Sequence, residues 1–190
     1  MNQFDKAILF AVKMHEGQKR KNGAPFIVHP LEVAAIAATI VDDIDVLCAA
    51  VLHDTVEDTS ATAEQIRLEF GEKISYLVAS ETENKRYTIP PHLTWRIRKE
   101  ESFEKLKKAQ DRNIKVLWLS DKLSNIRSIY SEYLRVGDSL WQRFHQKDKA
   151  EQYWYYRTAA QLLNELNDTA AWAEYNELVE KVFDRKCESK

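Results

Sequence analysis

An apolar stretch over residues 45–58 carries a histidine and an aspartate side by side, at His53 and Asp54. The preceding Ala-Ala-Val-Leu run is typical of a buried helix, where ionisable side chains are costly unless something neutralises them. Adjacent helical side chains point about 100° apart, so the pair can bind one ion only where its helix forms the wall of a bundle. An imidazole beside a carboxylate suits a divalent cation such as Mn²⁺, Fe²⁺ or Zn²⁺. The stretch therefore predicts a helix bundle with a metal site.

Two further carboxylates, Glu57 and Asp58, follow one helical turn later. Glu57 is four residues after His53 and Asp58 is four after Asp54, so a continuous helix would return both to the same wall. The alternative is a helix cap or a surface ion pair, the more frequent role of a His-Asp pair near a helix end. The apolar residues before the pair favour the metal site.

Length and composition favour one mostly helical domain over residues 1–190, because the chain is 44% hydrophobic with only 4 Gly and 4 Pro. The formal net charge of -2 gives no indication of nucleic-acid binding. No apolar run reaches the roughly 18 residues of a membrane span, and no signal peptide is recognisable. We therefore expect a cytoplasmic protein without membrane or nucleic-acid partners, in which Cys48 and Cys187 are free thiols.

Hydrophobic periodicity predicts an all-α fold, a single orthogonal bundle of about ten helices without a linker or an internal repeat. A capping-box pattern at Thr62-Ala-Glu-Gln65 opens one helix. Pro90-Pro91 breaks the pattern, so residues 81–94 are expected to form a surface loop, and the helix after it looks exposed and rich in charge. The expected helices cover residues 4–15, 31–41, 45–57, 62–71, 74–80, 95–109, 113–134, 150–166 and 170–183, with a short loop near Gly137.

Two more candidate ligands lie elsewhere in the chain. His29 ends a basic loop, just before Pro30 at the favoured first position of a helix. Asp121 lies in an apolar run; its alternative role is a buried pairing with Lys122, which is weak because adjacent helical residues do not face one another. Two histidines and two aspartates would leave coordination positions open for water and a phosphate oxygen, which is the pattern of a catalytic site.

Three segments resemble motifs of the HD-domain phosphohydrolases, and in particular the stand-alone small alarmone hydrolases of the RelA/SpoT type. They are residues 15–30 (HEGQKRKNGAPFIVHP), 49–59 (AAVLHDTVEDT) and 119–127 (LSDKLSNIR), and the resemblance covers about residues 4–165. It implies the HD-domain fold and hydrolysis of the 3′-pyrophosphate of ppGpp or pppGpp, which leaves GDP or GTP. No nucleotidyl-transfer region follows, so synthetase activity is not expected.

The resemblance also implies roles for individual residues. One Mn²⁺ ion would be held by His29, His53, Asp54 and Asp121, and the attacking water would be activated by Glu57 and Asp58. The residues implied to line the nucleotide site are Arg20, Lys21, Asn22, Asn125 and Ser128. The aromatic run at 153–156 could close over the substrate, with Tyr153 as the predicted contact, although core packing is the alternative for this run.

The basic triplet Lys19-Arg20-Lys21 fits a nucleotide site, because it concentrates positive charge near His29 and because an arginine can stack on a purine. The alternative is a solvated run of charge. Three features depart from the family pattern and bear on base specificity. They are Ser124, where many large bacterial members have histidine, Trp118, and the segment Glu81-Thr-Glu-Asn-Lys85.

The sequence leaves the substrate open among related small-molecule nucleotides. An adenosine alarmone of the ppApp type, or the 2′-phosphate of NADPH, would suit the same residues. A nucleotide-sensing module with little turnover is the third alternative, but a pure sensor has no need of the water-activating pair Glu57-Asp58. The oligomeric state is not readable from the sequence.

Overall fold

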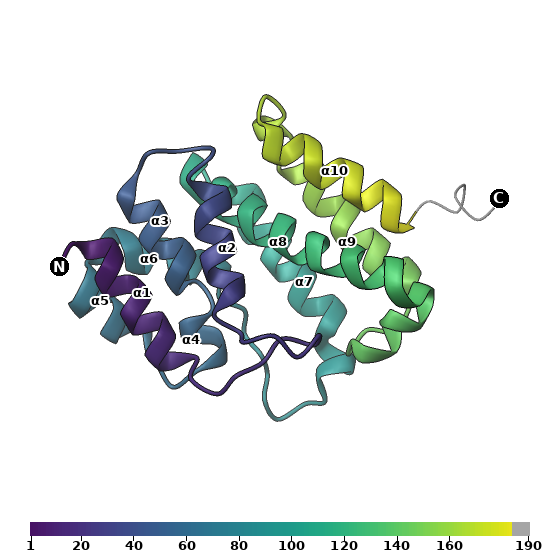
Figure 1. Ribbon diagram of the computed structural model, residues 1–190, viewed down its shortest axis with the longest axis horizontal. Helices are drawn as coiled ribbons and strands as arrows, with labels where there is room; N and C mark the ends of the chain where they lie inside the picture. The colour runs from purple at the N-terminus through teal and green to yellow at the C-terminus, as the bar shows by residue number, and fades with distance from the viewer. Residues whose placement is uncertain (184–190) are drawn as a thin grey trace.

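The structure is a computed structural model that describes residues 1–183. Within that range the chain forms ten α-helices and two short 3₁₀ helices, with one isolated β-bridge between Lys19 and Pro25 (Figure 1). The predicted all-α bundle is therefore confirmed. The elements are α1 (Gln3–Met14), α2 (Val28–Ala37), α3 (Ile44–Leu52), α4 (Thr55–Asp58), α5 (Ala63–Phe70), α6 (Glu72–Glu81), α7 (Pro91–Lys108), α8 (Arg112–Val136), η1 (Gly137–Arg143), α9 (Lys149–Leu162), η2 (Asn164–Leu166) and α10 (Ala170–Phe183).

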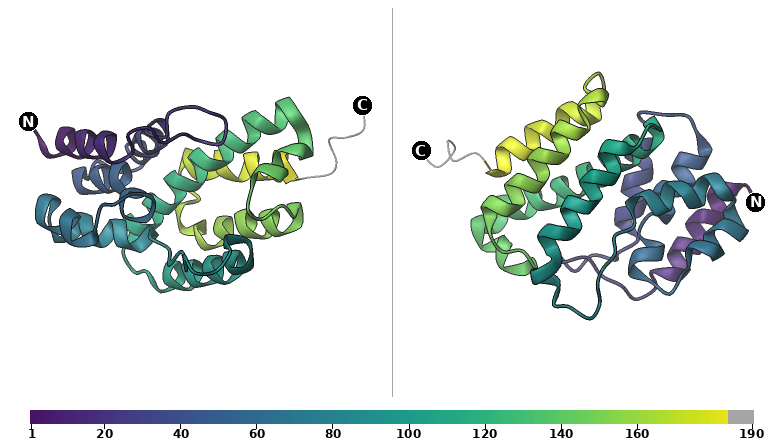
Figure 2. Two further views of the ribbon diagram at one scale, coloured as in Figure 1. Left: turned by 90° about the horizontal axis from the view of Figure 1, so that it is seen from below. Right: turned by 180° about the vertical axis from the view of Figure 1, so that it is seen from behind.

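The long helix α8 runs through the middle of the bundle. It packs against α2, α3 and α6 from the first half of the chain and against α10 from the second half (Figures 1 and 2). Helix α1 packs on α3, α5 packs on α6, and α7 packs on α9. Because α8 contacts both halves, any side chain near its centre is enclosed by helices from the whole length of the described chain.

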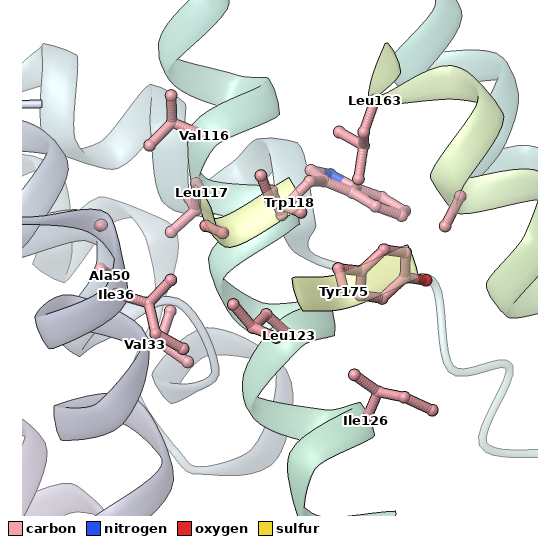
Figure 3. Close-up of a cluster of buried hydrophobic side chains, with 14 of the residues drawn as sticks. Val33, Ile36, Ala50, Val116, Leu117, Trp118, Leu123, Ile126, Leu163 and Tyr175 are labelled. Atoms are coloured by element: carbon pink, nitrogen blue, oxygen red, sulfur yellow. The ribbon is translucent and has the colours of Figure 1, made fainter. Parts of the chain in front are cut away.

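The core is continuous along α8, where every residue from Val116 to Ser124 is buried. Among the described residues, Trp118 of α8 and Tyr175 of α10 are the largest fully buried side chains (Figure 3). The Tyr175 hydroxyl donates a 2.9 Å hydrogen bond to the Tyr156 carbonyl. Burying each large apolar side chain contributes about 1.5–3 kcal/mol. Asp121 thus lies in a helical segment that is buried on all sides.

Several helix boundaries follow the predicted chemistry. The Thr62 hydroxyl accepts from the Gln65 backbone N–H at 3.1 Å and begins α5, as the capping pattern predicts. Gly71 follows with a φ of 95°, a conformation that favours glycine, and it separates α5 from α6. Helix α10 has the predicted bounds of 170–183.

Other boundaries correct the prediction. The helix expected over 45–57 ends at Leu52, and the short helix α4 begins at Thr55, so His53 and Asp54 form a junction between two helices. Helix α2 begins at Val28, which places Pro30 third in the helix, still in the first turn where a missing N–H is tolerated.

The second half of the chain also differs from expectation. Helix α7 begins at Pro91 because proline suits the first helical position, so the loop after α6 is shorter than 81–94. One face of α7 buries Trp95, Phe103 and Leu106, so this helix is only partly exposed. The segment near Gly137 forms the 3₁₀ helix η1 instead of a loop.

The basic loop before α2 is an ordered turn. The Arg20 backbone N–H donates to the Ala24 carbonyl at 2.9 Å, and the Phe26 N–H donates to the Gln18 carbonyl at 3.0 Å. Gly23 closes the turn with a φ of 89°, which side-chain-bearing residues rarely adopt. The turn fixes the backbone of the residues that carry the positive charges.

Two predictions from the sequence concern the cysteines and the absence of a membrane-spanning helix. Cys48 is a free, buried thiol, and burial raises its pKa to about 11, whereas Cys187 lies outside the described residues. Among the described helices, none combines the length and the apolar character needed to cross a lipid bilayer.

Candidate active site

Side chains from three separate segments converge beside α8. His29 comes from the first turn of α2, His53 and Asp54 from the α3–α4 junction, and Asp121 from the centre of α8. Nε2 of His29 lies 3.0 Å from Oδ1 of Asp121 and 3.5 Å from Oδ2 of Asp54. Nε2 of His53 lies 3.2 Å from the same Asp54 oxygen and 3.7 Å from the same Asp121 oxygen.

Both Nε2 atoms and the Asp121 oxygen are spaced to bind one divalent ion, and the Asp54 oxygen lies within 3.5 Å of each Nε2 atom. Ligand atoms about 2.1 Å from a common ion stand about 3 Å apart when they meet at right angles, close to the separations found here. The Nε2 atom of His53 is buried and lacks a hydrogen bond of suitable geometry, although Asp54 is near. An uncompensated buried nitrogen aimed at two carboxylates is the arrangement that a cation would complete. Potential ligand atoms of His29, His53 and Asp121 lie within 4.8 Å of one another.

The far ring nitrogen of each histidine has its own partner. Nδ1 of His53 lies 2.8 Å from the carbonyl oxygen of Ala50, which can only accept, so Nδ1 carries a proton and Nε2 is the nitrogen that faces the carboxylates. Nδ1 of His29 lies 2.8 Å from Oγ of Ser124. Such partners orient the rings of metal-binding histidines and hold them in one tautomer.

The charges in the cluster affect one another strongly. Burial lowers the pKa of His29 below its ordinary value and outweighs the opposing effect of Asp121. Burial also disfavours the protonated form of His53, but the Asp54 and Asp121 carboxylates outweigh it and raise the pKa of His53 well above the usual range. Burial raises the pKa of both aspartates, but His53 outweighs it at Asp54, and Lys122 together with the two histidines outweighs it at Asp121, so both pKa values are lowered. The two carboxylates therefore stay ionised at neutral pH.

The two oxygens of Asp121 have different neighbours. Oδ2 accepts a hydrogen bond from the Lys122 ammonium, while Oδ1 faces the histidines and accepts from Nδ2 of Asn125 at 2.7 Å. The expectation that Lys122 is badly placed to pair with its neighbour is therefore wrong, because the long lysine side chain folds back along the helix. Lys122 also lies over the Trp118 ring, at 4.5 Å, which fixes it between the core and the cluster.

Glu57 and Asp58 lie beside the cluster and share one cation. Nζ of Lys85 is 2.6 Å from Oε1 of Glu57 and 3.1 Å from Oδ1 of Asp58. The backbone N–H of Glu83 donates to Oε2 of Glu57 at 2.8 Å. Burial raises the pKa of Glu57, with the Lys85 charge acting in the opposite direction. A carboxylate with a raised pKa, close to a candidate ion, is suited to accept a proton from water.

Positive side chains from the basic turn face the same region. Nη2 of Arg20 donates to Oδ1 of Asn125 at 2.9 Å, so Asn125 links Arg20 to Asp121. The Lys21 ammonium lies 3.6 Å from the centre of the Phe144 ring, and burial lowers the pKa of Lys21 to about 8. The Asn22 side chain accepts from the Ala24 N–H at 3.1 Å and stabilises the turn.

Three adjoining cavities of 260, 390 and 460 Å³ open over these groups, and all three are lined by Lys21 and Phe144. The smallest is lined by three of the candidate ligands, His29, Asp54 and Asp121, and by the acidic pair, and the largest is bordered by the loop after α6. The middle cavity has a mixed lining of polar and apolar residues. Its lining includes Arg20, Asn22, Phe26, Asn125, Ser128, Ile129, Leu140, Arg143 and Tyr156.

The structure brings together all but one of the residues proposed from the sequence for this site. Tyr153 instead packs against Phe183 with ring centres 5.5 Å apart, and it lines none of the three cavities. Its neighbours Tyr155 and Tyr156 do line them. In an α-helix, Tyr155 points about 160° away from Tyr153, whereas Tyr156, three residues on, lies within about 60° of it, so the aromatic run alone could not select the correct ring.

Several residues that line the cavities were not predicted from the sequence. Glu81 is buried beside Lys122, burial raises its pKa to about 8, and one of its oxygens lacks a partner. Lys85 and Lys99 border the cavities from the loop after α6 and from α7. In the sequence, the segment at 81–85 stood out only because it departs from the family pattern.

The sequence is similar to proteins of a known family. The HD-domain family matches residues 7–151. A GTP pyrophosphokinase of Myxococcus xanthus is 36% identical over 126 residues, 65% of this chain and 17% of that protein. A guanosine-3′,5′-bis(diphosphate) 3′-pyrophosphohydrolase of Aquifex aeolicus is 36% identical over 130 residues, 67% of this chain and 18% of that protein. The chain thus spans less than a fifth of the length of these curated relatives.

Two solved structures share the fold over nearly their whole length. A metazoan orthologue of SpoT, described as hydrolysing ppGpp and acting in starvation responses, superimposes with a TM-score of 0.75 at 25% identity, covering 95% of this chain and 96% of that one. The crystal structure of lmo0812 from Listeria monocytogenes EGD-e gives a TM-score of 0.71 at 33% identity, covering 85% and 97%.

Proposed function

This chain belongs to the HD-domain family, and we propose that it is a metal-dependent hydrolase that removes the 3′-pyrophosphate of ppGpp or pppGpp and leaves GDP or GTP. The observation that carries the proposal is that each of two histidine Nε2 atoms lies 3.0–3.7 Å from an oxygen of Asp54 and an oxygen of Asp121, beside the cavity that is lined by Glu57 and Asp58. The activity described for the metazoan relative supports the choice of substrate. We propose that residues 1–190 act as one hydrolase domain.

The proposed cofactor is one Mn²⁺ ion held by His29, His53, Asp54 and Asp121. Mixed imidazole and carboxylate ligands suit Mn²⁺ better than the harder Mg²⁺, which prefers oxygen ligands. When bound, the ion would supply a Lewis acid for the phosphoryl group and would lower the pKa of a coordinated water. The hydrogen bonds from the outer ring nitrogens to the Ala50 carbonyl and the Ser124 hydroxyl support this assignment, because they leave Nε2 of each ring facing the carboxylates.

Glu57 is proposed as the general base that takes the proton of the attacking water. Asp58 shares the Lys85 ammonium with it and assists in proton transfer. The water oxygen forms a bond to the phosphorus attached to the nucleoside, the bond from that phosphorus to the 3′ oxygen breaks, and the 3′ oxygen receives a proton as pyrophosphate leaves. Burial keeps the pKa of Glu57 above that of an exposed glutamate, which makes it a better base.

The nucleoside is proposed to lie in the 390 Å³ cavity next to the metal cavity. Phe26 and Ile129 offer apolar surface to a base, and Arg20 can present its planar guanidinium to a purine ring. Asn125 and Ser128 supply polar contacts from α8, and Lys21 supplies positive charge to the phosphates. Asn22 supports the turn that carries Arg20 and Lys21.

A panel of substrates tests the proposal. Protein loaded with Mn²⁺ is incubated with ppGpp, pppGpp, ppApp and NADPH, and nucleotide, pyrophosphate and phosphate are quantified by chromatography. We expect GDP or GTP with equimolar pyrophosphate from the guanosine alarmones, and no such products from Asp54→Asn. Asp168→Asn, a change at an exposed residue far from the cluster, serves as the matched control.

Different products would redirect the proposal. Pyrophosphate from ppApp alone would assign an adenosine alarmone, and phosphate from NADPH alone would assign a 2′-phosphatase. Tight binding of ppGpp without turnover of any compound would overturn the enzyme assignment and favour a sensing module.

A further inference from the structure

Ser124 lies behind the candidate metal centre and lines none of the three cavities. The His29 ring contacts its hydroxyl through Nδ1 at 2.8 Å, and the same hydroxyl donates to Oε2 of Glu32 at 2.8 Å. Both His29 and Ser124 are buried, with exposed fractions of 3% and 1%. Ser124 departs from the family pattern, and this departure was expected to bear on base specificity. The structure shows that Ser124 instead contacts a candidate metal-binding histidine.

The arrangement follows from two helical repeats. Glu32 lies three residues after His29 on α2, and Ser124 lies three residues after Asp121 on α8. Residues three apart lie on one face of a helix, so the two packed helices each contribute a candidate ligand and, one turn away, a supporting side chain. The two hydrogen bonds cross the α2–α8 contact (Figure 1).

The hydrogen-bond directions fix where the His29 proton resides. A serine hydroxyl has one proton, and Ser124 gives it to the Glu32 carboxylate, which has none to give back. The Ser124 oxygen can then only accept from Nδ1 of His29, so Nδ1 carries the hydrogen. Nε2 is the nitrogen that faces Asp54 and Asp121.

The chain of contacts continues beyond Glu32. Nη1 of Arg127 lies 3.1 Å from Oε1 of Glu32, and Arg127 makes two further hydrogen bonds of 2.7 Å with the Glu174 carboxylate on α10. A planar guanidinium that bridges two carboxylates holds both in fixed orientations. The support of His29 thus reaches from α2 across α8 to α10.

We propose that Ser124, with Glu32 behind it, is a positioning residue that holds His29 in its Nδ1–H tautomer and so prepares Nε2 to bind the metal ion. Arg127 and Glu174 extend this support to α10. The inference rests on the metal centre of the proposed function. It adds residues that touch neither the nucleotide cavity nor the ion.

Metal affinity tests the role directly. Mn²⁺ dissociation constants are measured at pH 8 by electron paramagnetic resonance of the free ion for the wild type and Ser124→Ala. Removal of such an outer partner typically costs about 10–100-fold in metal affinity, and we expect a loss in that range. Ser120→Ala is the matched control, because Ser120 is buried one turn earlier on α8 and donates instead to the Val116 carbonyl.

A second readout needs no metal. Nitrogen NMR of ring-labelled metal-free protein at pH 8 reports which His29 nitrogen carries the proton. The wild type should show Nδ1 fully protonated, whereas Ser124→Ala should show Nδ1 protonated in only part of the molecules, with the proton of the remainder on Nε2 next to Asp121. Glu32→Gln should also show a mixture, since a carboxamide can donate as well as accept and frees the hydroxyl to turn.

The outcomes separate this inference from the proposed function. If the wild type binds Mn²⁺ tightly while Ser124→Ala matches it in both affinity and tautomer, Ser124 has no positioning role and the metal centre still stands. If Ser120→Ala weakens binding as much as Ser124→Ala, the effect is general packing and the inference is overturned. If the wild type itself binds no Mn²⁺, the proposed metal centre fails, and only the tautomer measurement then decides the role of Ser124.

Discussion

The Lys85 ammonium lies 2.6 Å from Oε1 of Glu57. Two more groups of the same loop contact this residue, since the Glu83 N–H donates to Oε2 and the Tyr87 hydroxyl donates to the Glu57 carbonyl oxygen at 3.3 Å. The loop between α6 and α7 therefore orients the proposed general base and supplies its nearest positive charge.

Replacing Lys85 with methionine should move the acid limb of the pH–rate profile to higher pH. The charges that face Glu57 are Lys85, which lowers its pKa, and Asp54 and Glu83, which raise it together with burial. A general base works only when ionised, so activity is lost as pH falls through its pKa, and removing Lys85 raises that pKa. We expect a shift of about one pH unit in kcat/KM. An unmoved acid limb would exclude Lys85 from tuning the base; Lys107→Met, at an exposed ion pair on α7, is the control.

Isosteric changes in the acidic residues should separate metal binding from chemistry. Asp54→Asn should lose metal, because a neutral amide replaces a carboxylate near both histidines. Glu57→Gln should keep metal content and substrate affinity but lose about 10²–10⁴-fold in kcat, as expected for a missing general base. Elemental analysis and steady-state kinetics measure both. Near-normal turnover of Glu57→Gln would remove Glu57 from the mechanism.

Lys21 should make substrate binding sensitive to alkaline pH and to salt. Its pKa is lowered to about 8 by burial and by the charges of Arg20 and Lys99, so it loses its charge as pH rises through that value. We expect KM to increase above about pH 8 in the wild type and to lack that increase in Lys21→Ala. Lys21→Ala should also bind more weakly at low salt, with a smaller difference at high salt. Identical KM profiles for the two proteins would show that Lys21 is only a solvated charge.

Glu83 should stabilise the fold in a pH-dependent way. It contacts Arg98 at 2.5 Å and Lys99 at 2.6 Å, and these charges outweigh burial and lower its pKa from 4.5 to about 2. The stabilisation is present above about pH 4.5 and is lost as pH falls towards 2. At pH 7, Glu83→Gln should reduce the free energy of unfolding by about 3 kcal/mol, because it leaves two partly buried cations without their partner.

Urea denaturation at pH 7 and at pH 3 measures this effect. The difference between wild type and Glu83→Gln should shrink at the lower pH, where the wild-type carboxylate begins to take up a proton. Glu100→Gln, at an exposed helical pair, should change stability by less than about 0.5 kcal/mol at either pH. A pH-independent difference for Glu83→Gln would contradict the electrostatic explanation.

The sequence was most informative where periodic hydrophobicity coincided with clear end signals. Helix α10 was predicted with its observed bounds, and α8 was predicted to within two residues at each end. The Thr62 cap was also confirmed. These helices are long or begin with a capping side chain, so local chemistry decides their extent.

The α3–α4 junction could not be predicted from hydrophobic periodicity. The apolar pattern continues through residues 45–57, but the helix ends at Leu52, and the Thr55 hydroxyl donates to the Leu52 carbonyl there. Periodicity cannot reveal this, since a break of two residues hardly changes which side chains are apolar. The hydrogen bond from the Asp58 N–H to the Asp54 carbonyl preserves one turn, which keeps Glu57 and Asp58 near the cluster.

The support of the site was harder to predict than the site itself. Ser124, Lys85 and Glu81 reach the cluster through tertiary contacts that join segments distant in sequence. Their residue types are common, and no spacing rule relates them to His29 or Glu57. The candidate ligands, in contrast, were conspicuous because ionisable side chains are rare within apolar helices.

Hydrolysis of ppGpp in water enriched in the heavy oxygen isotope tests directly whether the proposed metal centre promotes attack of water on phosphorus. Mass spectrometry of both products, with Mn²⁺-loaded protein and with the chelated protein, shows which bond is broken and whether metal is required. Water attack on phosphorus at the proposed centre predicts one heavy oxygen in pyrophosphate, none in GDP, and no reaction after chelation. Heavy oxygen in GDP, release of single phosphate in place of pyrophosphate, or undiminished turnover by metal-free protein would contradict the account.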